Sequence, residues 1–184
     1  ENVARLEDIS YLEAIEMTYY GAKVIHPKTI KPLQNKNIPM FVRPFDHPEK
    51  QGTRISGTES PFLPPIVVVE SDQALLEIST RDFSFVAEEH LGEIFSRVAA
   101  VRIKVNSMRN TALSFMMCVR NEKDKLTKLQ QELISSFHIT IHEDLELITV
   151  RHANQKFLDQ LEKGKEIILE EKFGDTDQYI VRNV

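Results

Sequence analysis

The residue types with the clearest chemical potential lie in the segment Tyr20-Gly-Ala-Lys-Val-Ile-His-Pro-Lys-Thr-Ile30. The ammonium group of Lys23 could neutralise phosphate charge, because phosphoryl transfer depends mainly on positioning and charge neutralisation. A lysine that follows a helix-ending glycine is more often a solvated charge near the negative end of that helix. His26 has the chemistry of an acid or base, but no carboxylate or nucleophile lies beside it in the sequence. We therefore expect His26 to pack or hydrogen-bond at the start of a helix that Pro27 begins.

The first element expected to position this segment is a helix over Ser10–Tyr20. Ser10 and Glu13 form a Ser-x-x-Glu capping box at its start, and Gly21 supplies its C-terminal stop. The apolar stripe expected on this helix consists of Leu12, Ile15 and Tyr19.

A short second helix and two strands complete the expected N-terminal part. Pro27 suits the first turn of a helix that ends near Asn35. The segments Ile38–Arg43 and Thr53–Ser56 read as strands around a turn-rich segment. Residues 58–65 contain three prolines, so they predict a linker and a domain boundary.

Beyond this linker the pattern predicts a run of strands and helices in the order β-α-β-β-α-β, which is the ferredoxin-like order. A strand at Ile66–Glu70 precedes this first full unit. The elements expected in the unit are strand Ala74–Ser79, helix Glu88–Ala100, strands Arg102–Met108 and Ala112–Val119, helix Glu122–Ser136 capped by Asn121, and strand His138–His142. The order then restarts with strand Leu145–Val150, a helix between Asn154 and Gly164, and strands Glu166–Glu170 and Gln178–Arg182.

The predicted fold class is therefore α+β, with two tandem ferredoxin-like (βαββαβ) units after an N-terminal α/β part. The second unit lacks a final helix and strand, and Ile66–Glu70 is the spare strand that could complete its sheet. The predicted domains are residues 1–57, a linker at 58–65, a first unit at 66–143 and a short second unit at 144–184.

Composition and charge exclude several classes of function. The formal net charge is −5, which argues against nucleic acid as the main partner, since phosphate binding needs a basic face. The sequence contains no run of about 18 apolar residues, so no membrane span is predicted. The start at Glu1 is no signal peptide, and the missing Met suggests an excised or processed piece. Cys118, the one cysteine, lies in an apolar run, so we expect a buried thiol and a reducing cytoplasm.

The helix-like run, the Gly-Ala-Lys-Val-Ile-His-Pro segment and Gly52-Thr-Arg-Ile-Ser56 resemble the end of the catalytic domain of aspartate kinases, which phosphorylate aspartate with ATP. The following units resemble the tandem ACT domains, amino-acid-sensing modules, of that family. The resemblance is strongest over residues 9–56. It implies that Lys23 and Val24 border the nucleotide, and that the complete enzyme uses ATP with Mg²⁺. No catalytic residue, bound cofactor, metal site or kinase activity is expected in this part alone.

The same resemblance implies that lysine or threonine binds between ACT units, and that a homodimer forms through them. The residues expected to contact this effector are Ser84, Ala87, His90, Leu91, Val105 and Asn106. Glu89 and His90 stand where the family loop has a glycine before a hydrophobic residue. Asn106 stands where lysine-sensing members often have aspartate, and Lys104 adds a like charge beside it. These departures leave open another effector, a shifted site or a purely dimerising pair.

Two alternatives remain beside the regulatory part of an aspartate kinase. One is a non-enzymatic ACT-type module that binds an amino acid for another partner. The other is part of a bifunctional enzyme that is fused to homoserine dehydrogenase. A ferredoxin-like RNA binder is disfavoured because the chain is acidic and has no basic strand studded with aromatic residues.

Overall fold

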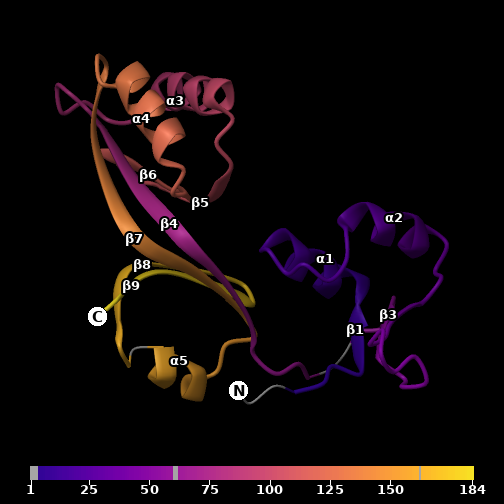
Figure 1. The fold of residues 1–184 in the computed structure, drawn as a ribbon. Coiled ribbons are helices and arrows are strands. Elements are labelled where there is room, and N and C mark those ends of the chain that lie inside the picture. Colours follow the sequence, from indigo (N-terminus) through magenta and orange to yellow (C-terminus); the bar gives the residue numbers. More distant parts are fainter. Residues whose placement is uncertain (1–3, 60–61, 162) are drawn as a thin grey trace. The chain divides into compact units, whose positions relative to one another are not determined.

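The computed structural model describes residues 4–59, 62–161 and 163–184 (Figure 1). The chain divides into two compact units, and four strands of the described chain pass from one unit into the other. The first unit consists of the described residues of Glu1–Val68, Thr149–Gln160 and Lys172–Asp177. The second consists of Val69–Ile148, Leu161–Glu171 and Gln178–Val184, as far as they are described.

A small sheet and two helices form the N-terminal part of the first unit. Its elements are β1 (Asp8–Ser10), α1 (Tyr11–Tyr19), α2 (Pro27–Asn35), β2 (Met40–Val42) and β3 (Thr53–Ser56). The strand order is β1-β3-β2, with β1 parallel and β2 antiparallel to β3. Its buried core is made by Ile9, Tyr11, Ala14, Ile30 and Ile55. The expected second helix and the expected strands in this part are confirmed.

Helix α1 is confirmed, but only Ile15 of its expected stripe packs against the core. Ser10 Oγ accepts a hydrogen bond from Glu13 N at 3.0 Å, and Gly21 follows the helix with a φ of 108°. Leu12 and Tyr19, however, are 60% and 69% exposed. The buried face carries Glu13, whose side chain accepts hydrogen bonds from Arg151 and does not return to Ser10. A partner so distant in the sequence leaves no local pattern.

Among the described residues from 62 onward, six strands form one sheet and three segments are helices (Figure 1). Its strands are β4 (Ile66–Thr80), β5 (Val105–Asn110), β6 (Ser114–Arg120), β7 (Phe137–Arg151), β8 (Lys165–Phe173) and β9 (Thr176–Asn183). The helices are α3 (Glu88–Val101), α4 (Lys123–Leu133) and α5 (Gln155–Leu161). The strand order is β5-β6-β4-β7-β9-β8.

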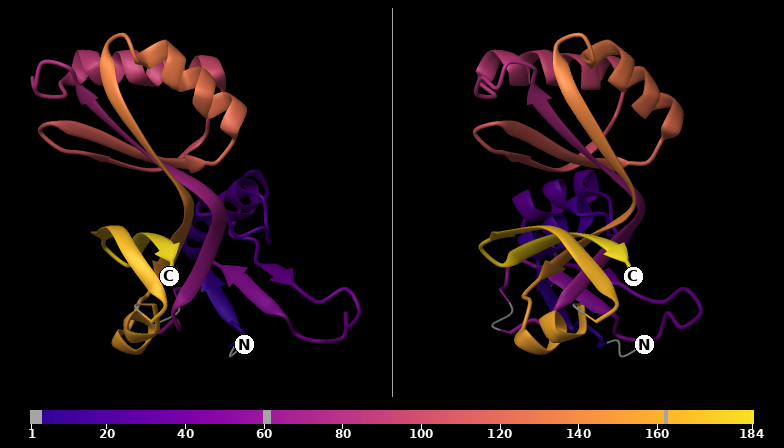
Figure 2. Two further views of the ribbon diagram at one scale, coloured as in Figure 1. Left: turned by 60° about the vertical axis from the view of Figure 1, so that its left-hand side comes forward. Right: turned by 90° about the vertical axis from the view of Figure 1, so that its left-hand side faces the viewer.

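The four separate strands expected around residues 66–79 and 138–150 are wrong, because they form two continuous strands of 15 residues each. Both views of Figure 2 show β4 in magenta and β7 in orange running side by side. Asp72 and Asp144 have φ values of 58° and 59° near the middle of these strands. A short polar residue tolerates this left-handed conformation, so the strand changes direction there without ending. The sheet places β6 and then β5 beside β4, and β9 and then β8 beside β7, and this order confirms the predicted tandem ferredoxin-like fold.

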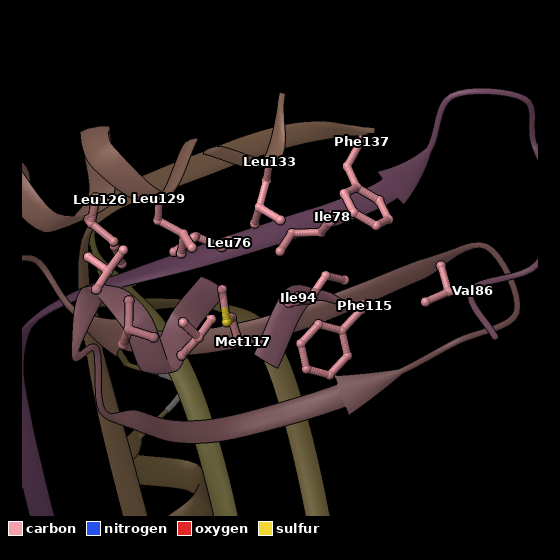
Figure 3. Close-up of a cluster of buried hydrophobic side chains, with 14 residues drawn as sticks. Leu76, Ile78, Val86, Ile94, Phe115, Met117, Leu126, Leu129, Leu133 and Phe137 are labelled. Carbon is pink, nitrogen blue, oxygen red and sulfur yellow. The ribbon is translucent and has the colours of Figure 1, made fainter. Parts of the chain in front are cut away.

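The main core of the second unit lies between α3, α4 and the strands β4 and β6 (Figure 3). Ile94 and Val98 of α3 and Leu126, Leu129 and Leu133 of α4 are buried in it. A second buried cluster consists of Leu75, Cys118, Leu145, Leu147 and Ile180. Cys118 is fully buried, which confirms the prediction of a buried thiol, and this burial raises the pKa of the thiol to about 12.

Two expected boundaries in this unit are wrong. Asn121 does not cap α4, because the residue before the helix is Glu122, and the Asn121 Oδ1 atom is buried without a hydrogen-bond partner in the described chain. The expected strand at Arg102–Met108 begins only at Val105, since Arg102 ends α3 with a φ of 58°. Left-handed backbone is uncommon for arginine, so the sequence carried no signal for this ending.

Candidate functional site

The segment that contains Lys23 and Val24 is tied to the end of α1. Gly21 N donates to Thr18 O at 3.2 Å and Ala22 N donates to Met17 O at 3.0 Å. Lys23 and Val24 are exposed, and no ion pair to Lys23 is found among the described residues. The ammonium group is therefore available to an anionic ligand.

His26 caps the following helix, as expected from the sequence. Its Nδ1 accepts a hydrogen bond from Lys28 N at 3.2 Å, and Pro27 occupies the first position of α2. A histidine ring that is occupied as an acceptor in this way serves the backbone of α2, which confirms the structural interpretation over an acid or base.

A cavity of about 300 Å³ lies beside this segment, between α1 and the small sheet. Most of its lining is apolar, and Val24 belongs to it. The lining residues are Ala4, Arg5, Leu6, Ile9, Ala14, Met17, Thr18, Ala22, Val24, Ile25, Val42, Thr53 and Ile55. Its volume is at the small end of the range for ligand sites, so it suits a flat apolar group of modest size.

A cluster of charged and polar residues that are buried or partly buried, here called the Arg151 cluster, consists of Glu13, Glu16, Arg151, His152 and Thr176, all in the first unit. Arg151 donates to both carboxylate oxygens of Glu13, at 2.7 Å and 2.9 Å, and to Thr176 Oγ1 at 2.6 Å. Its NH1 group lies 3.6 Å from Glu16 Oε2. The Nε2 atom of His152 lies 3.2 Å from Glu13 Oε2, within ion-pair distance.

The electrostatics of this cluster favour its charged form. Burial alone would raise the pKa of the Glu13 carboxyl, but the hydrogen bonds and charges of Arg151 and His152 outweigh burial and lower that pKa. The hydrogen bond from Arg151 to Glu13 in turn raises the pKa of the guanidinium group. Sequence reasoning missed the cluster because 138 positions separate Glu13 from Arg151.

The expected effector loop between β4 and α3 is held by its own hydrogen bonds. Asp82 Oδ1 accepts from Ser84 N and Ser84 Oγ, at 3.1 Å and 2.7 Å. Ala87 precedes α3, and its N–H group donates to His90 Nδ1 at 3.1 Å. The His90 ring also meets Phe137 edge-on, with centroids 6.0 Å apart. His90 thus takes one backbone amide of this loop, whereas Leu91 packs against the core.

Asn106 presents an unused hydrogen-bond acceptor at the start of β5. It lies at an irregularity in the β5–β6 pairing, between Val105 and Ser107. Its Nδ2 donates to Gln73 Oε1 at 2.9 Å, and Gln73 Nε2 donates to Ser71 O at 2.9 Å. The Asn106 Oδ1 atom is buried and has no partner in the described part of the chain. Such an oxygen is suited to an ammonium or hydroxyl donor.

The two halves of the expected effector site lie at opposite ends of β6 within one chain. Val86 N donates to Ala112 O at 3.0 Å, which places the loop near the start of β6. Val105 pairs with Val119, which places Asn106 near the end of that strand. Because β6 contains seven residues, these ends are about 20 Å apart. One amino acid therefore cannot contact both halves in a single chain.

Within residues 4–59, 62–161 and 163–184, no three His, Cys, Asp or Glu side chains gather where they could hold a metal ion. No helix in the described part of the chain is long and apolar enough to cross a membrane.

Comparison with known proteins begins with one family model. Residues 1–44 match the amino acid kinase family. Lysine-sensitive aspartokinase 3 of Escherichia coli is 27% identical over 154 residues, which are 79% of this chain and 34% of that protein. A bifunctional aspartokinase/homoserine dehydrogenase of Haemophilus influenzae is 29% identical over 157 residues, 79% of this chain and 19% of that protein. This chain thus spans about a third of the length of the first relative and about a fifth of the second.

Solved structures show the same fold. Aspartate kinase from Clostridium acetobutylicum superposes with a TM-score of 0.82 at 19% identity, over 100% of this chain and 46% of that chain. Escherichia coli aspartokinase III, in complex with lysine and aspartate (T-state), gives 0.75 at 21% identity, over 98% and 43% of the two chains. The same enzyme with aspartate and ADP (R-state) gives 0.76 at 21% identity, over 97% and 43%.

A free-standing amino-acid sensor would not explain the match of the N-terminal residues to a kinase family. Both relatives are aspartokinases or fusions of them, and the superpositions extend from the small sheet through the six-stranded sheet. The sequence relatives, the fold and the kinase match together fit the C-terminal, regulatory part of an aspartokinase.

Proposed function

We propose that the complete protein is an aspartate kinase, which transfers a phosphoryl group from ATP to L-aspartate and forms 4-phospho-L-aspartate in lysine, threonine and methionine biosynthesis. The observation that carries this proposal is the joining of an amino acid kinase segment, residues 1–44, to a tandem ferredoxin-like sheet in one chain. The Escherichia coli structure with aspartate and ADP supports the choice of substrates. The chain described here holds the regulatory domains and the end of the catalytic domain, and lacks kinase activity by itself.

Lys23 and Val24 contact the nucleotide in this proposal. The exposed ammonium of Lys23 would neutralise phosphate charge, and Val24 lines the apolar cavity beside it, which suits an adenine ring. Mg²⁺ would be bound by other parts of the complete enzyme, since no cluster of metal-binding side chains is found among the described residues. ATP and Mg²⁺ are therefore cofactors of the complete enzyme.

A test of the nucleotide site compares two lysines in the complete enzyme. Lys23→Ala removes a charge-assisted contact to phosphate, so the KM for ATP should rise about tenfold. Lys28→Ala on α2, which also removes an exposed charge, should leave that KM unchanged. An unchanged KM in Lys23→Ala would contradict the proposed contact.

Lysine or threonine binds the ACT pair as feedback effector in this proposal, and the complex of the Escherichia coli enzyme with lysine supports it. The Asn106 oxygen accepts from the effector ammonium, because that atom is buried without a partner in the described chain. The backbone at the start of α3 binds the effector carboxylate, with Ser84, Ala87, His90 and Leu91 around it. Val105 packs beside Asn106.

A homodimer completes the effector site. Ser84 and Asn106 lie at opposite ends of β6, so the loop of one copy must meet the β5 strand of another to surround one amino acid. The edge strand β5 leaves backbone groups unpaired within the chain, which favours such an association. We also place the protein in the cytoplasm, where a lone buried thiol such as Cys118 stays reduced.

The direct test of effector binding is thermal unfolding of the 184-residue chain with lysine, threonine, methionine and related amino acids. A ligand at one hundred times its Kd stabilises the folded state by about 2.7 kcal/mol, which raises the melting temperature by roughly 5–10 °C. Asn106→Ala should lose this response, whereas Asn110→Ala, an exposed residue on the same strand, should keep it. No response of the wild-type chain to any of these amino acids would contradict the proposal.

A further inference from the structure

Helix α1 is contacted at both of its ends by residues of the six-stranded sheet, at the end of β7 and at the start of β9. Glu13 in its first turn accepts two hydrogen bonds from Arg151, the last residue of β7. At the other end, the Tyr20 phenol is hydrogen-bonded to Thr176, the first residue of β9. Burial and the charge of Glu16 raise the pKa of this phenol, and the hydrogen bond with Thr176 offsets part of that rise. Thr176 also accepts a hydrogen bond from Arg151 at 2.6 Å.

The contact between Arg151 and Glu13 is strong because it is bidentate and because both side chains are largely shielded from solvent. The side chains of Arg151 and Glu13 are only 12% and 6% exposed. Separating them would leave a buried charge unpaired, which is strongly unfavourable. A displacement of the end of β7 therefore has to carry the first turn of α1 with it, or break the pair.

The proposed nucleotide segment follows the same helix without a break. Tyr20, which Thr176 contacts, is the residue after α1, and the chain reaches Lys23 three residues later. The bonds from Gly21 N to Thr18 O and from Ala22 N to Met17 O attach this segment to the helix backbone. A shift of α1 is therefore a shift of Lys23 and Val24.

At its other end, β7 begins at the expected effector loop. Phe137, its first residue, is buried in the main core and contacts the ring of His90. The strand then runs for 15 residues to Arg151. A single covalently continuous element thus starts beside the residues proposed to bind the effector and ends on the helix that carries the proposed nucleotide contacts.

We propose that Arg151 is a positioning residue through which the effector-binding sheet sets the place of α1, and with it the affinity of the Lys23–Val24 segment for ATP. This inference rests on the proposed function, since it assigns a route to the feedback regulation proposed above. It makes Glu13 the receiving residue on the catalytic side, and it gives the unpredicted Arg151 cluster a role beyond stability.

The test uses the complete enzyme and compares three arginine variants. In Arg151→Ala, the effector concentration for half-inhibition should rise at least tenfold and the KM for ATP should rise severalfold, with kcat changed less. Arg151→Lys keeps the positive charge but loses the bidentate hydrogen bonding of the guanidinium group. Its half-inhibition concentration and its KM for ATP should therefore lie between those of Arg151→Ala and wild type. The matched control is Arg182→Ala, which breaks an exposed ion pair with Glu166 and should match wild type.

Effector binding is measured separately, by the thermal response of the same variants in the 184-residue chain. Arg151→Ala should respond to the effector as wild type does, because Arg151 belongs to the first compact unit whereas Asn106 belongs to the second. In this proposal Arg151 transmits the effect of binding and does not contact the effector. Retained binding with lost inhibition is the result that a purely structural role does not produce. If Arg151→Ala does not fold, the same comparison is made with Arg151→Lys, which should bind the effector as wild type does and should be inhibited less strongly.

Failure of the proposed function and failure of this inference give different results. A wild-type enzyme that shows no aspartate-dependent ADP formation, or no inhibition by any amino acid, overturns the proposed function and this inference with it. An active, inhibited wild type together with an Arg151→Ala or Arg151→Lys variant that keeps the same half-inhibition and KM for ATP overturns this inference alone.

Discussion

At the scale of single residues, the polar groups that matter most are those whose partners lie far away in the sequence. Glu13 looked like half of a capping box, yet its carboxylate is buried against Arg151. Asn106 was expected at the effector site only from the family resemblance, and no local pattern indicated that its oxygen is buried without a partner among the described residues. His26, whose partner is two residues away, was predicted correctly as a helix-capping group. Local partners can be read from a sequence, whereas long-range ones cannot.

The Glu13 pair makes the stability of the chain depend on pH. The folded-state pKa of Glu13 lies below its unfolded value near 4.5, so the pair adds stability above that pH and loses it as pH falls toward the folded-state pKa. Glu13→Gln should therefore be destabilised at pH 7, by about 3 kcal/mol. The difference from wild type should shrink below pH 4.5. Urea denaturation at several pH values measures it.

Glu166→Gln is the control for this experiment, because Glu166 pairs with Arg182 at an exposed position. Glu166→Gln should lower the free energy of unfolding by less than about 1 kcal/mol at every pH. A difference between wild type and Glu13→Gln that stays constant from neutral to acid pH would show that the Glu13 charge is not what stabilises the fold.

At the scale of elements, the sequence predicted helices and hairpins better than the long strands. The bounds of α2 and β3 were correct, because proline and flanking turn residues mark them. Strands β4 and β7 were each divided in two, since Asp72 and Asp144 resemble strand breakers. Their neighbours in the sheet provide backbone partners on both sides of each aspartate, so the strands continue. That compensation is tertiary and is invisible in the local pattern.

Two glycines offer a matched test of the element geometry. Gly92 lies inside α3, where an added Cβ meets nothing within 4 Å, so Gly92→Ala should stabilise the chain by about 1 kcal/mol. Gly52 has a φ of 69°, and an added Cβ would lie 2.1 Å from Val42 O. Gly52→Ala should therefore destabilise it. Thermal unfolding compares both, and a stabilised Gly52→Ala would contradict the hairpin between β2 and β3.

A core substitution tests the packing of the helices on the large sheet. Leu129 is fully buried in the cluster drawn in Figure 3, so Leu129→Ala should cost about 2–5 kcal/mol. Leu113, half exposed between β5 and β6, is the control, and Leu113→Ala should change stability by less than about 0.5 kcal/mol. Equal costs in urea denaturation would mean that α4 does not pack as described.

At the scale of the whole molecule, the predicted domain boundaries at 57, 65 and 143 remain predictions, and so does the dimer. If the effector site needs two copies, sedimentation equilibrium should give twice the 21.2 kDa mass of one chain, and the effector should strengthen the association. A chain that responds to the effector while it stays at the mass of one copy would contradict the two-copy site.

The most direct test of the account is ADP formation by the complete protein, measured with and without aspartate and across lysine and threonine concentrations. The account predicts ADP formation that requires aspartate, is inhibited by one of the two amino acids, and is absent from the 184-residue chain alone. ADP formation that is indifferent to aspartate, or an aspartate kinase that responds to neither amino acid, would contradict it.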